Sequence, residues 1–277
     1  MKHTHISSKN KKFYLNLKEV WQYRELIVLF AKRSFQVSYK QTILGPMWLF
    51  INPFMAAVFD IILFGNIAKL STDGVPQLLF YLSGHSLWNF FSGRVNSNAN
   101  TFVGNASLFG KVYFPRLVIP IADVLSGIIR FVIQFFMIAV LYGYYAIKNM
   151  VQLNIRLLPC VPLIIFELGL LAMGVGIIIS SLTTKYRDLA VLVEFALQLW
   201  MYATPIVYPI SSVSGVLKTI ILINPVTAPT ELFRCALFHT GVVTSGQMLY
   251  SVIVTFGVTV FGIIIFNKVE RTFIDTV

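Results

Sequence analysis

The stretch MLYSVIVTFGVTVFGIIIF, from Met248 to Phe266, decides the fold class, because it carries no charged residue at all. A helix needs about 20 apolar residues to cross the hydrocarbon core of a bilayer. We therefore interpret this stretch as a transmembrane helix and work outward from it.

The rest of the chain has the same apolar character. Its 277 residues are 57% hydrophobic and only 12% charged, with a mean hydropathy of +0.76, whereas soluble domains are about a quarter charged. This length allows roughly six spans with short loops. The predicted fold is an all-α polytopic membrane protein with six transmembrane helices in a domain that covers 46–267.

Five apolar stretches precede the helix predicted from Met248 to Phe266. They are predicted to be the other spans: 46–66, 77–103, 118–147, 157–182 and 189–207. The segment 208–246 differs, because three prolines interrupt apolar pieces that are too short to cross. Such pieces are tolerated in a membrane where protein or a cavity covers their backbone ends. We expect re-entrant helices on the outer side there.

The N-terminal segment 1–45 is basic, and from about Leu17 it carries apolar residues at helical spacing with Lys and Arg between them. This pattern predicts an amphipathic helix lying at the membrane interface, where its basic side chains reach anionic lipid headgroups. The alternative is a soluble helix packed on a partner protein.

The net charge of +11 is interpreted as a topology signal rather than as a nucleic-acid site, because Lys and Arg accumulate in cytoplasmic loops. If the N-terminus is inside, the inside segments hold 15 Lys and Arg and the outside segments hold 5. Both termini are therefore predicted to be cytoplasmic, with a cytoplasmic turn at 104–117 and a cytoplasmic tail at 268–277.

Nucleotide-binding chemistry is absent from the sequence. The nearest approach to a phosphate-binding loop runs from Gly104 to Val112, but five residues separate its glycines and Val112 replaces the hydroxyl residue. Neither cysteine has metal-ligand spacing. We expect no catalytic residue, metal or cofactor in this chain, so any ATP and Mg would bind a different chain.

Four acids and a histidine fall within the predicted spans: Asp60, Asp123, Glu167, Glu194 and His85. Carboxylates inside a membrane can relay protons, or can pair with buried cations. Because the four are scattered over four spans, we favour structural roles for them, namely pairing with Arg94 or Arg130, capping of helix ends, or a position near an interface. We expect His85 to be an ordinary hydrogen-bonded histidine. The fourth span also has small residues that would let helices approach closely: Gly169, Ala172, Gly174 and Gly176.

Four local patterns resemble the permease subunits of polysaccharide ABC exporters, the O-antigen and capsule type of the ABC-2 family. They are YRELIVLFAKRSFQVSYKQTILGPMWLFINP (Tyr23 to Pro53), KVYFPRLVIP (Lys111 to Pro120), KYRDL (Lys185 to Leu189) and KVERTFIDTV (Lys268 to Val277). Their order and spacing match the family over nearly the whole chain.

The resemblance implies an ATP-driven exporter that moves lipid-linked polysaccharide across the bacterial inner membrane. It implies a homodimer with two copies of a separate P-loop ATPase, and membrane lipids but no nucleic acid as other partners. The coupling segment, residues 104–117, would contact the ATPase through the residues Phe109, Lys111, Val112, Tyr113, Phe114, Pro115 and Arg116. An interfacial gate would comprise Trp21, Tyr39 and Lys40.

Sugar rings stack on aromatic side chains while their hydroxyls seek polar partners, so aromatic residues in the spans are candidates for a glycan channel. We predict that this channel is lined by Phe54, Phe59, Trp88, Arg94, Trp200 and Tyr202. An interfacial aromatic belt is the alternative for any one of the aromatic residues.

Three other functions are compatible with parts of the sequence. A proton-coupled secondary carrier would need essential acids inside the membrane and no partner ATPase. A membrane-embedded glycan or lipid transferase would need acids or histidines clustered at one membrane face. An ABC exporter of small molecules would differ only in the local motifs and the aromatic content.

Overall fold

The structure is a computed structural model that describes residues 17–40, 42–184, 186 and 188–273. These residues form helices and joining turns, and no strand occurs among them. The elements are α1 (Leu17–Gln22), α2 (Arg24–Tyr39), η1 (Gly45–Met47), α3 (Trp48–Asp60), the π-helix η2 (Ile61–Ile67), α4 (Gln77–Ala99), α5 (Thr101–Gly104), α6 (Ala106–Phe109), α7 (Val118–Ile147), α8 (Cys160–Thr183), α9 (Leu189–Tyr202), η3 (Ile210–Ser212), α10 (Gly215–Ile223), α11 (Thr227–Phe238) and α12 (Ser245–Phe273).

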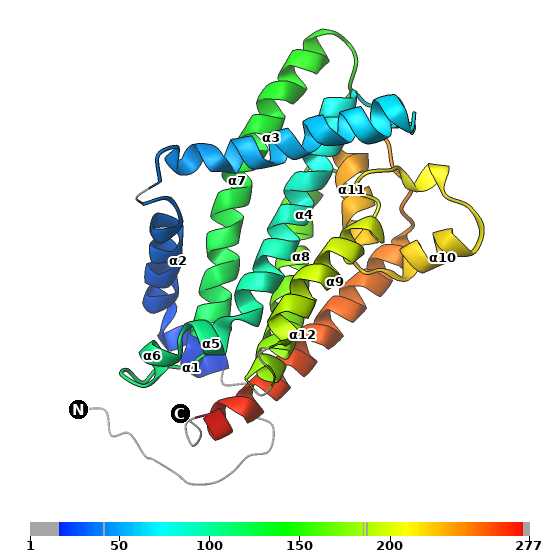
Figure 1. Cartoon of the computed structure of the whole chain (residues 1–277). Helices are drawn as coiled ribbons and strands as arrows, with labels where there is room; N and C mark the ends of the chain where they lie inside the picture. The colour runs from blue at the N-terminus through cyan, green and yellow to red at the C-terminus, as the bar shows by residue number, and fades with distance from the viewer. Residues whose placement is uncertain (1–16, 41, 185, 187, 274–277) are drawn as a thin grey trace.

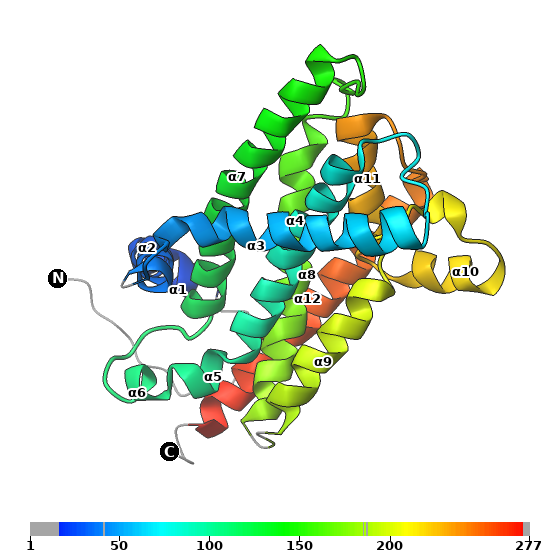
Figure 2. The same cartoon turned by 45° about the horizontal axis from the view of Figure 1, so that its top comes forward.

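Helix α4 lies at the centre of the bundle, where it contacts α3, α7, α8 and α9 (Figure 1). Its first half is almost wholly buried and supplies large apolar side chains to the main core, with Phe131 of α7 and Phe233 of α11 among their neighbours. Helix α3 runs across the outside of α4 and α7 in both views (Figures 1 and 2). On α4 itself, Asn89 is exposed and Ser92, Gly93 and Asn96 are only partly buried.

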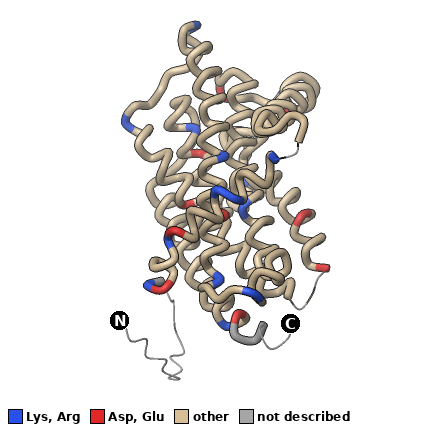
Figure 3. The backbone as a smooth tube through the Cα atoms, turned by 90° about the vertical axis from the view of Figure 1, so that its left-hand side faces the viewer, with Lys and Arg blue, Asp and Glu red and all other residues tan. Residues whose placement is uncertain are grey.

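Four helical segments have the length and apolarity of a membrane span: Gly45–Ile67, Val118–Ile147, Cys160–Thr183 and Ser245–Glu270. Long stretches of the backbone carry no charge (Figure 3). Helix α4 is 23 residues long but polar in its second half, and α9 has 14 residues, or roughly 21 Å at 1.5 Å per residue. The all-helical membrane fold is confirmed, whereas the count of six spans stays a prediction.

Most of the segments predicted to be cytoplasmic share one end of the bundle, but α2, which belongs to the predicted inside segment 1–45, runs from that end along α7 toward the start of α3. Helices α1, α5 and α6, the start of α9 and the last turns of α12 all lie at the bottom of Figure 1, and the α7–α8 loop lies at the opposite end. The predicted topology, which rests on the count of Lys and Arg in the loops, requires the inside loops to lie at the same end of the bundle. The side of the membrane that this end faces stays a prediction.

Helix α2 packs against α7. The Arg130 guanidinium donates hydrogen bonds to the Ser34 carbonyl oxygen at 3.2 Å and to Ser38 Oγ at 2.8 Å. The helix expected near Leu17 to Lys40 is therefore present, broken once at Tyr23. Its place at a membrane interface stays a prediction, and residues 1–16 lie outside the described residues.

The small residues of α8 do bring helices together. A Cβ atom on Gly174 would lie 2.8 Å from Thr259 Cα of α12, and one on Gly262 would lie 2.7 Å from the Gly174 carbonyl oxygen. On another side of α8, a Cβ atom on Gly176 would lie 2.9 Å from the Val95 carbonyl oxygen of α4. The predicted close approach is confirmed, and α12 contributes a glycine of its own.

Several helix ends differ from the approximate bounds predicted for the spans, and α4, for example, ends at Ala99 rather than near 103. The fourth span begins at Cys160 rather than at 157, and α12 continues through Phe273, into the segment set apart as a tail. Helix α9 ends at Tyr202 rather than at 207. Pro205 disfavours helical backbone at the residue before it, and the Asn224 amide donates to the Ala203 carbonyl oxygen at 3.1 Å, which fixes the turn.

The proline-rich segment forms α10 and α11, which are bent by 94° where they meet. Such a pair is either a broken span or a re-entrant loop. We expect the re-entrant form.

Candidate functional site

The coupling segment lies at the end of the bundle that also holds α1 (Figure 1). Helices α5 and α6 open it, and a non-helical run follows from Lys111 to Arg116. Lys111, Val112 and Tyr113 are exposed, with Tyr113 at 79%. Phe109 is half-buried, and Phe114, Pro115 and Arg116 are buried. The seven predicted contact residues therefore divide into an outward group and an inward group.

The inward group anchors the segment to the end of α12. The Arg116 guanidinium donates to the Glu270 carbonyl oxygen at 3.0 Å, and its central carbon lies 4.9 Å from the centre of the Phe109 ring. Phe102 stacks on Phe266 of α12, with 4.4 Å between the ring centres. Burial lowers the pKa of Arg116, and the Glu270 carboxylate opposes that shift. Arg116 thus holds the segment in place instead of facing a partner.

We expect Arg116→Ala to destabilise this end of the protein by about 2 kcal/mol, because a hydrogen bond from a charged group and a cation–π contact are lost together. Thermal unfolding of the purified chain in detergent measures the effect. Val112→Ala, at an exposed position of the same segment, serves as the control. Unchanged thermal stability of the Arg116 variant would contradict the anchoring role.

The outward group meets α1. The Tyr113 hydroxyl donates to Glu19 Oε1 at 3.4 Å, and the negative charge of Glu19 raises the pKa of Tyr113. Val20 of α1 packs in the same apolar cluster as Phe114 and Phe266. The surface at this end of the molecule is therefore built from three distant parts of the chain, namely α1, the coupling segment and the end of α12.

The three residues predicted to form an interfacial gate are not brought together. Trp21 is exposed on α1 beside Arg24, whereas Tyr39 and Lys40 lie at the far end of α2. The Tyr39 ring packs against Phe35 with 5.1 Å between ring centres and a tilt of 59° between the ring planes. The Arg130 guanidinium carbon lies 5.7 Å from the centre of the same ring.

The six predicted channel residues take different places on α3, α4 and α9. Phe54, Phe59 and Tyr202 are exposed, whereas Trp88 and Arg94 are 5% and 6% exposed. Trp200 is half-buried, and its Nε1 donates to Asn224 Oδ1 at 3.0 Å. Phe91 lies between the two tryptophans, 5.5 Å from Trp88 and 5.2 Å from Trp200 between ring centres. The aromatic residues thus join α4 to α9.

A polar strip on α4 was missed from the sequence. Its residues recur at the spacing of one helix face: Asn89, Ser92, Gly93 and Asn96. Glu194 and Gln198 stand four residues apart on α9, across from the strip. The spacing of these residues in the sequence is the signal that predicts a polar face on this helix.

Two hollows flank this strip. The first, of about 320 Å³, lies between α4 and α9 and is lined by Trp88, Ser92, Gly93, Asn96, Glu194, Leu197, Gln198 and Met201. The second, of about 310 Å³, is lined from four elements, namely the end of α2, α3, α4 and α7. Gly93 lines both hollows. We name the strip together with the first hollow the translocation face.

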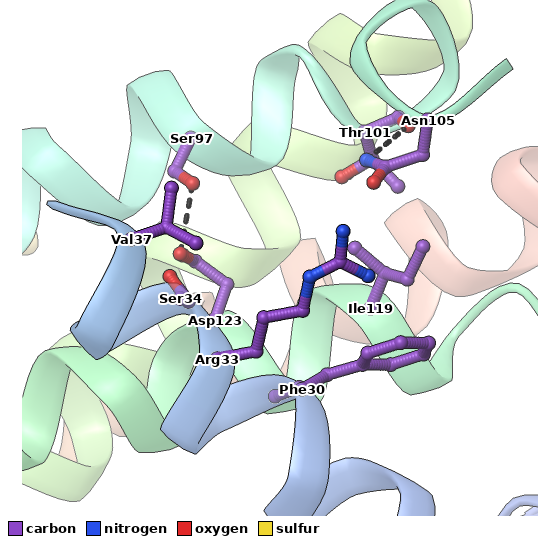
Figure 4. A pocket seen from close by; sticks show the side chains of 10 residues that line it. Phe30, Arg33, Ser34, Val37, Ser97, Thr101, Asn105, Ile119 and Asp123 are labelled. Carbon is purple, nitrogen blue, oxygen red and sulfur yellow. Dashed lines mark hydrogen bonds between the residues drawn. The ribbon is translucent and has the colours of Figure 1, made fainter. Parts of the chain in front are cut away.

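A third hollow lies between α2 and the adjoining ends of α4 and α7 (Figure 4). Arg33 of α2 extends into it, and Asp123 lies on its wall. The Asp123 carboxylate accepts hydrogen bonds from Arg94, from Ser97 Oγ at 2.8 Å and from Asn98 Nδ2 at 3.3 Å. Asp123 is therefore fully engaged by α4.

The other intramembrane acids also have partners, with one exception. Asp60 Oδ2 lies 2.6 Å from His85 Nε2, and Glu167 Oε1 accepts from Ser251 Oγ at 2.5 Å. The expected pairing of Asp123 with Arg94 and the ordinary role of His85 are confirmed. Glu194 alone is exposed, on the translocation face. Three of the four acids are thus occupied in holding helices together.

Comparison with known proteins agrees with this architecture. The model of the family described as ABC-2 type transporter matches residues 25–238. The chain is 26% identical to the O-antigen export system permease protein RfbA of Klebsiella pneumoniae over 251 residues, which cover 91% of this chain and 94% of that protein. It is 28% identical to a protein of the same name from Myxococcus xanthus, over 80% of this chain and 84% of that protein. Because the family model covers α2 through α11, the chain belongs to the ABC-2 type transporter family.

Proposed function

We propose that this chain is the membrane-spanning subunit of an ATP-driven exporter of lipid-linked bacterial polysaccharide, of the O-antigen or capsule type. The observation that carries the proposal is the polar and aromatic translocation face on an otherwise apolar bundle. A hydrophilic glycan cannot cross hydrocarbon, because each hydroxyl that loses its hydrogen bonds costs kilocalories. The names of the two relatives support polysaccharide as the cargo.

The translocation face is one wall of a conduit and needs a second wall. A two-fold dimer supplies it, because the same surface of a second copy then faces the first. We therefore propose a homodimer with six spans per subunit, both termini in the cytoplasm of the bacterial inner membrane. Two copies of a P-loop ATPase, with ATP and Mg, complete the exporter.

The proton-coupled carrier has less support. Its relay would require acids that are free to exchange protons, and Asp60, Asp123 and Glu167 are held by hydrogen bonds within the bundle. A transferase would require clustered acids or histidines. Among the described residues no group of three His, Cys, Asp or Glu side chains could hold a metal ion.

A deletion experiment tests the proposal. Removing the gene from its bacterium should abolish surface polysaccharide and leave lipid-linked polymer on the cytoplasmic side, as fractionation and gel analysis would show. Export should return when the chain is restored with its ATPase partner. Gradient-driven transport by the purified chain alone in proteoliposomes would refute the proposal.

Tyr113→Ala should separate ATP hydrolysis from export, since Tyr113 is the most exposed aromatic side chain of the coupling segment. We expect polymer export to fall strongly while the complex still assembles and still hydrolyses ATP. Parallel assays of ATPase activity and surface polymer measure the two effects. Tyr186→Ala, in the exposed turn before α9, is the matched control. Undiminished export in the Tyr113 variant would remove this residue from the coupling surface.

A further inference from the structure

The first hollow, between α4 and α9, holds an exposed carboxylate on a helix that is otherwise uncharged. Glu194 is the only charged residue of α9, and it lines the hollow. Among the described residues it has no hydrogen-bond or ion-pair partner, unlike Asp60, Asp123 and Glu167. A carboxylate within a membrane that pairs with no cation faces a water-filled cavity. The hollow is therefore a wet surface of the bundle.

The polar groups beside Glu194 are neutral. Gln198 stands one turn further along α9, and Ser92 and Asn96 line the hollow from α4. The side-chain amides of Gln198 and Asn96 make no hydrogen bond to any described residue. The Ser92 hydroxyl donates to the Trp88 carbonyl oxygen at 2.8 Å and keeps its acceptor lone pairs. This set of groups suits a ligand that is rich in hydroxyls.

The first hollow has no cation that could neutralise an anionic ligand. Of the described side chains that line it, none is basic, and Glu194 supplies the only formal charge. Arg94, in the second hollow, pairs with Asp123 of α7, and Arg130 donates to Ser34 of α2. These two arginines thus interact with α7 and α2, whereas Glu194 lies on α9. The charge in the first hollow is negative.

The hollow lies toward the end of the bundle that holds the coupling segment (Figure 1). Glu194 is five residues beyond the start of α9, which is about 8 Å at 1.5 Å per residue. Asn96 is three residues before α4 ends at Ala99. A polymer that enters from the predicted cytoplasmic side would therefore meet Glu194 early in its passage. The second copy in the proposed dimer adds a second Glu194 to the entry.

We propose that this hollow is an entry filter that admits uncharged sugar units and rejects acidic ones. The inference rests on the proposed function and adds the chemical class of the polymer that is exported. Sugar hydroxyls can donate to the Glu194 carboxylate and to the amide oxygens of Gln198 and Asn96, which replaces hydrogen bonds that the sugar loses with water. An acidic sugar would bring a second negative charge to Glu194, and the repulsion grows as water is excluded. Selectivity then depends on a repulsive group as well as on attractive ones.

Charged thiol reagents measure the potential in the hollow directly. The purified full-length chain in detergent carries Cys160→Ser and Cys235→Ser, and Gln198→Cys places a thiol one turn from Glu194. The rate of labelling by cationic trimethylammonioethyl methanethiosulfonate is divided by the rate for anionic sulfonatoethyl methanethiosulfonate. Adding Glu194→Gln should lower this ratio about tenfold, because the two reagents respond to the lost charge with opposite sign.

Two matched controls separate the charge from other effects. Glu194→Asp keeps the carboxylate, so the ratio of the two labelling rates should stay close to that of the parent. Glu25→Gln removes an equal charge from an exposed position of α2 and should also leave the ratio unchanged. Size-exclusion profiles establish that each variant is folded before labelling. An unchanged ratio in the Glu194→Gln variant would overturn the inference.

Export in cells tests the filter itself. The deletion strain receives the ATPase partner, the parent chain or a variant, and enzymes that build either an uncharged polymer or the same polymer with a uronic acid in each repeat. The parent should export little of the acidic polymer, and Glu194→Gln should raise the ratio of acidic to uncharged polymer at the surface about tenfold.

Three outcomes in cells would overturn the inference. The first is equal export of the two polymers by the parent chain. The second is an unchanged ratio of the two polymers in the Glu194→Gln variant. The third is loss of both polymers in that variant, which would show a general need for Glu194 instead of selection by charge. Each result would leave the deletion experiment unaffected, so the proposed function could stand alone.

Discussion

Gly93→Trp should abolish polysaccharide export while leaving the protein folded in the membrane. Gly93 lies on α4 where the two hollows meet, and a Cβ atom built there would have no atom within 4 Å. An indole at this position therefore projects into open space on the translocation face. It would obstruct a passing polymer without displacing a core side chain.

The measurement is the amount of surface polysaccharide in cells that carry only the variant chain, compared with the amount of chain in their membranes. Gly257→Trp is the matched control, since Gly257 also has no atom within 4 Å of a built Cβ and lies on the exposed side of α12. We expect the control to export normally. Normal export with tryptophan at position 93 would show that the polymer passes elsewhere.

The membrane fold could be predicted because it depends on composition and on the length of apolar runs. A stretch such as Met248 to Phe266 needs no knowledge of its neighbours to be recognised as a span. Likewise, the distribution of Lys and Arg places the loops in two groups, and the structure places α1, α6, the start of α9 and the end of α12 at one end of the bundle. These signals are local or additive, so the sequence contains them in full.

The direction in which each intramembrane side chain faces could not be predicted in the same way. Lipid and protein core are both apolar, so a helix such as α9 has no clear pattern that separates its lipid side from its packed side. Trp88, Phe54 and Phe59 were all expected on a channel wall, yet only Trp88 lines one of the two hollows beside the polar strip of α4. The direction in which such a side chain faces depends on contacts between residues that are distant in the sequence, and a single sequence does not reveal those contacts.

The inward position of Arg116 illustrates the same limit at the coupling segment. Its basic, aromatic surroundings suggested a surface that faces a partner, and Tyr113 fits that expectation. The end of α12 lies beside the segment only in the folded chain, and it takes up the Arg116 guanidinium through Glu270. Glu270, more than 150 positions away in the sequence, thus helps to determine which side of the coupling segment is buried.

Asp123→Ala should be among the most destabilising substitutions in the chain. It removes a buried carboxylate that accepts hydrogen bonds from Arg94, Ser97 and Asn98. The Arg94 guanidinium would then be left buried without its counter-charge, which costs about 3–5 kcal/mol. We expect a large fall in the thermal unfolding temperature in detergent, measured by size-exclusion chromatography after heating.

The double variant Arg94→Met with Asp123→Leu tests whether that cost comes from the stranded charge. Replacing both members of a buried ion pair by apolar side chains of similar size is often neutral or stabilising. The double variant should therefore regain most of the stability that Asp123→Ala loses, even though it changes two residues instead of one. If the double variant were as unstable as the single one, the α4–α7 contact would depend on the shape of these side chains. The ion pair between Arg94 and Asp123 would then not be the reason that a polar helix can occupy the centre of this bundle.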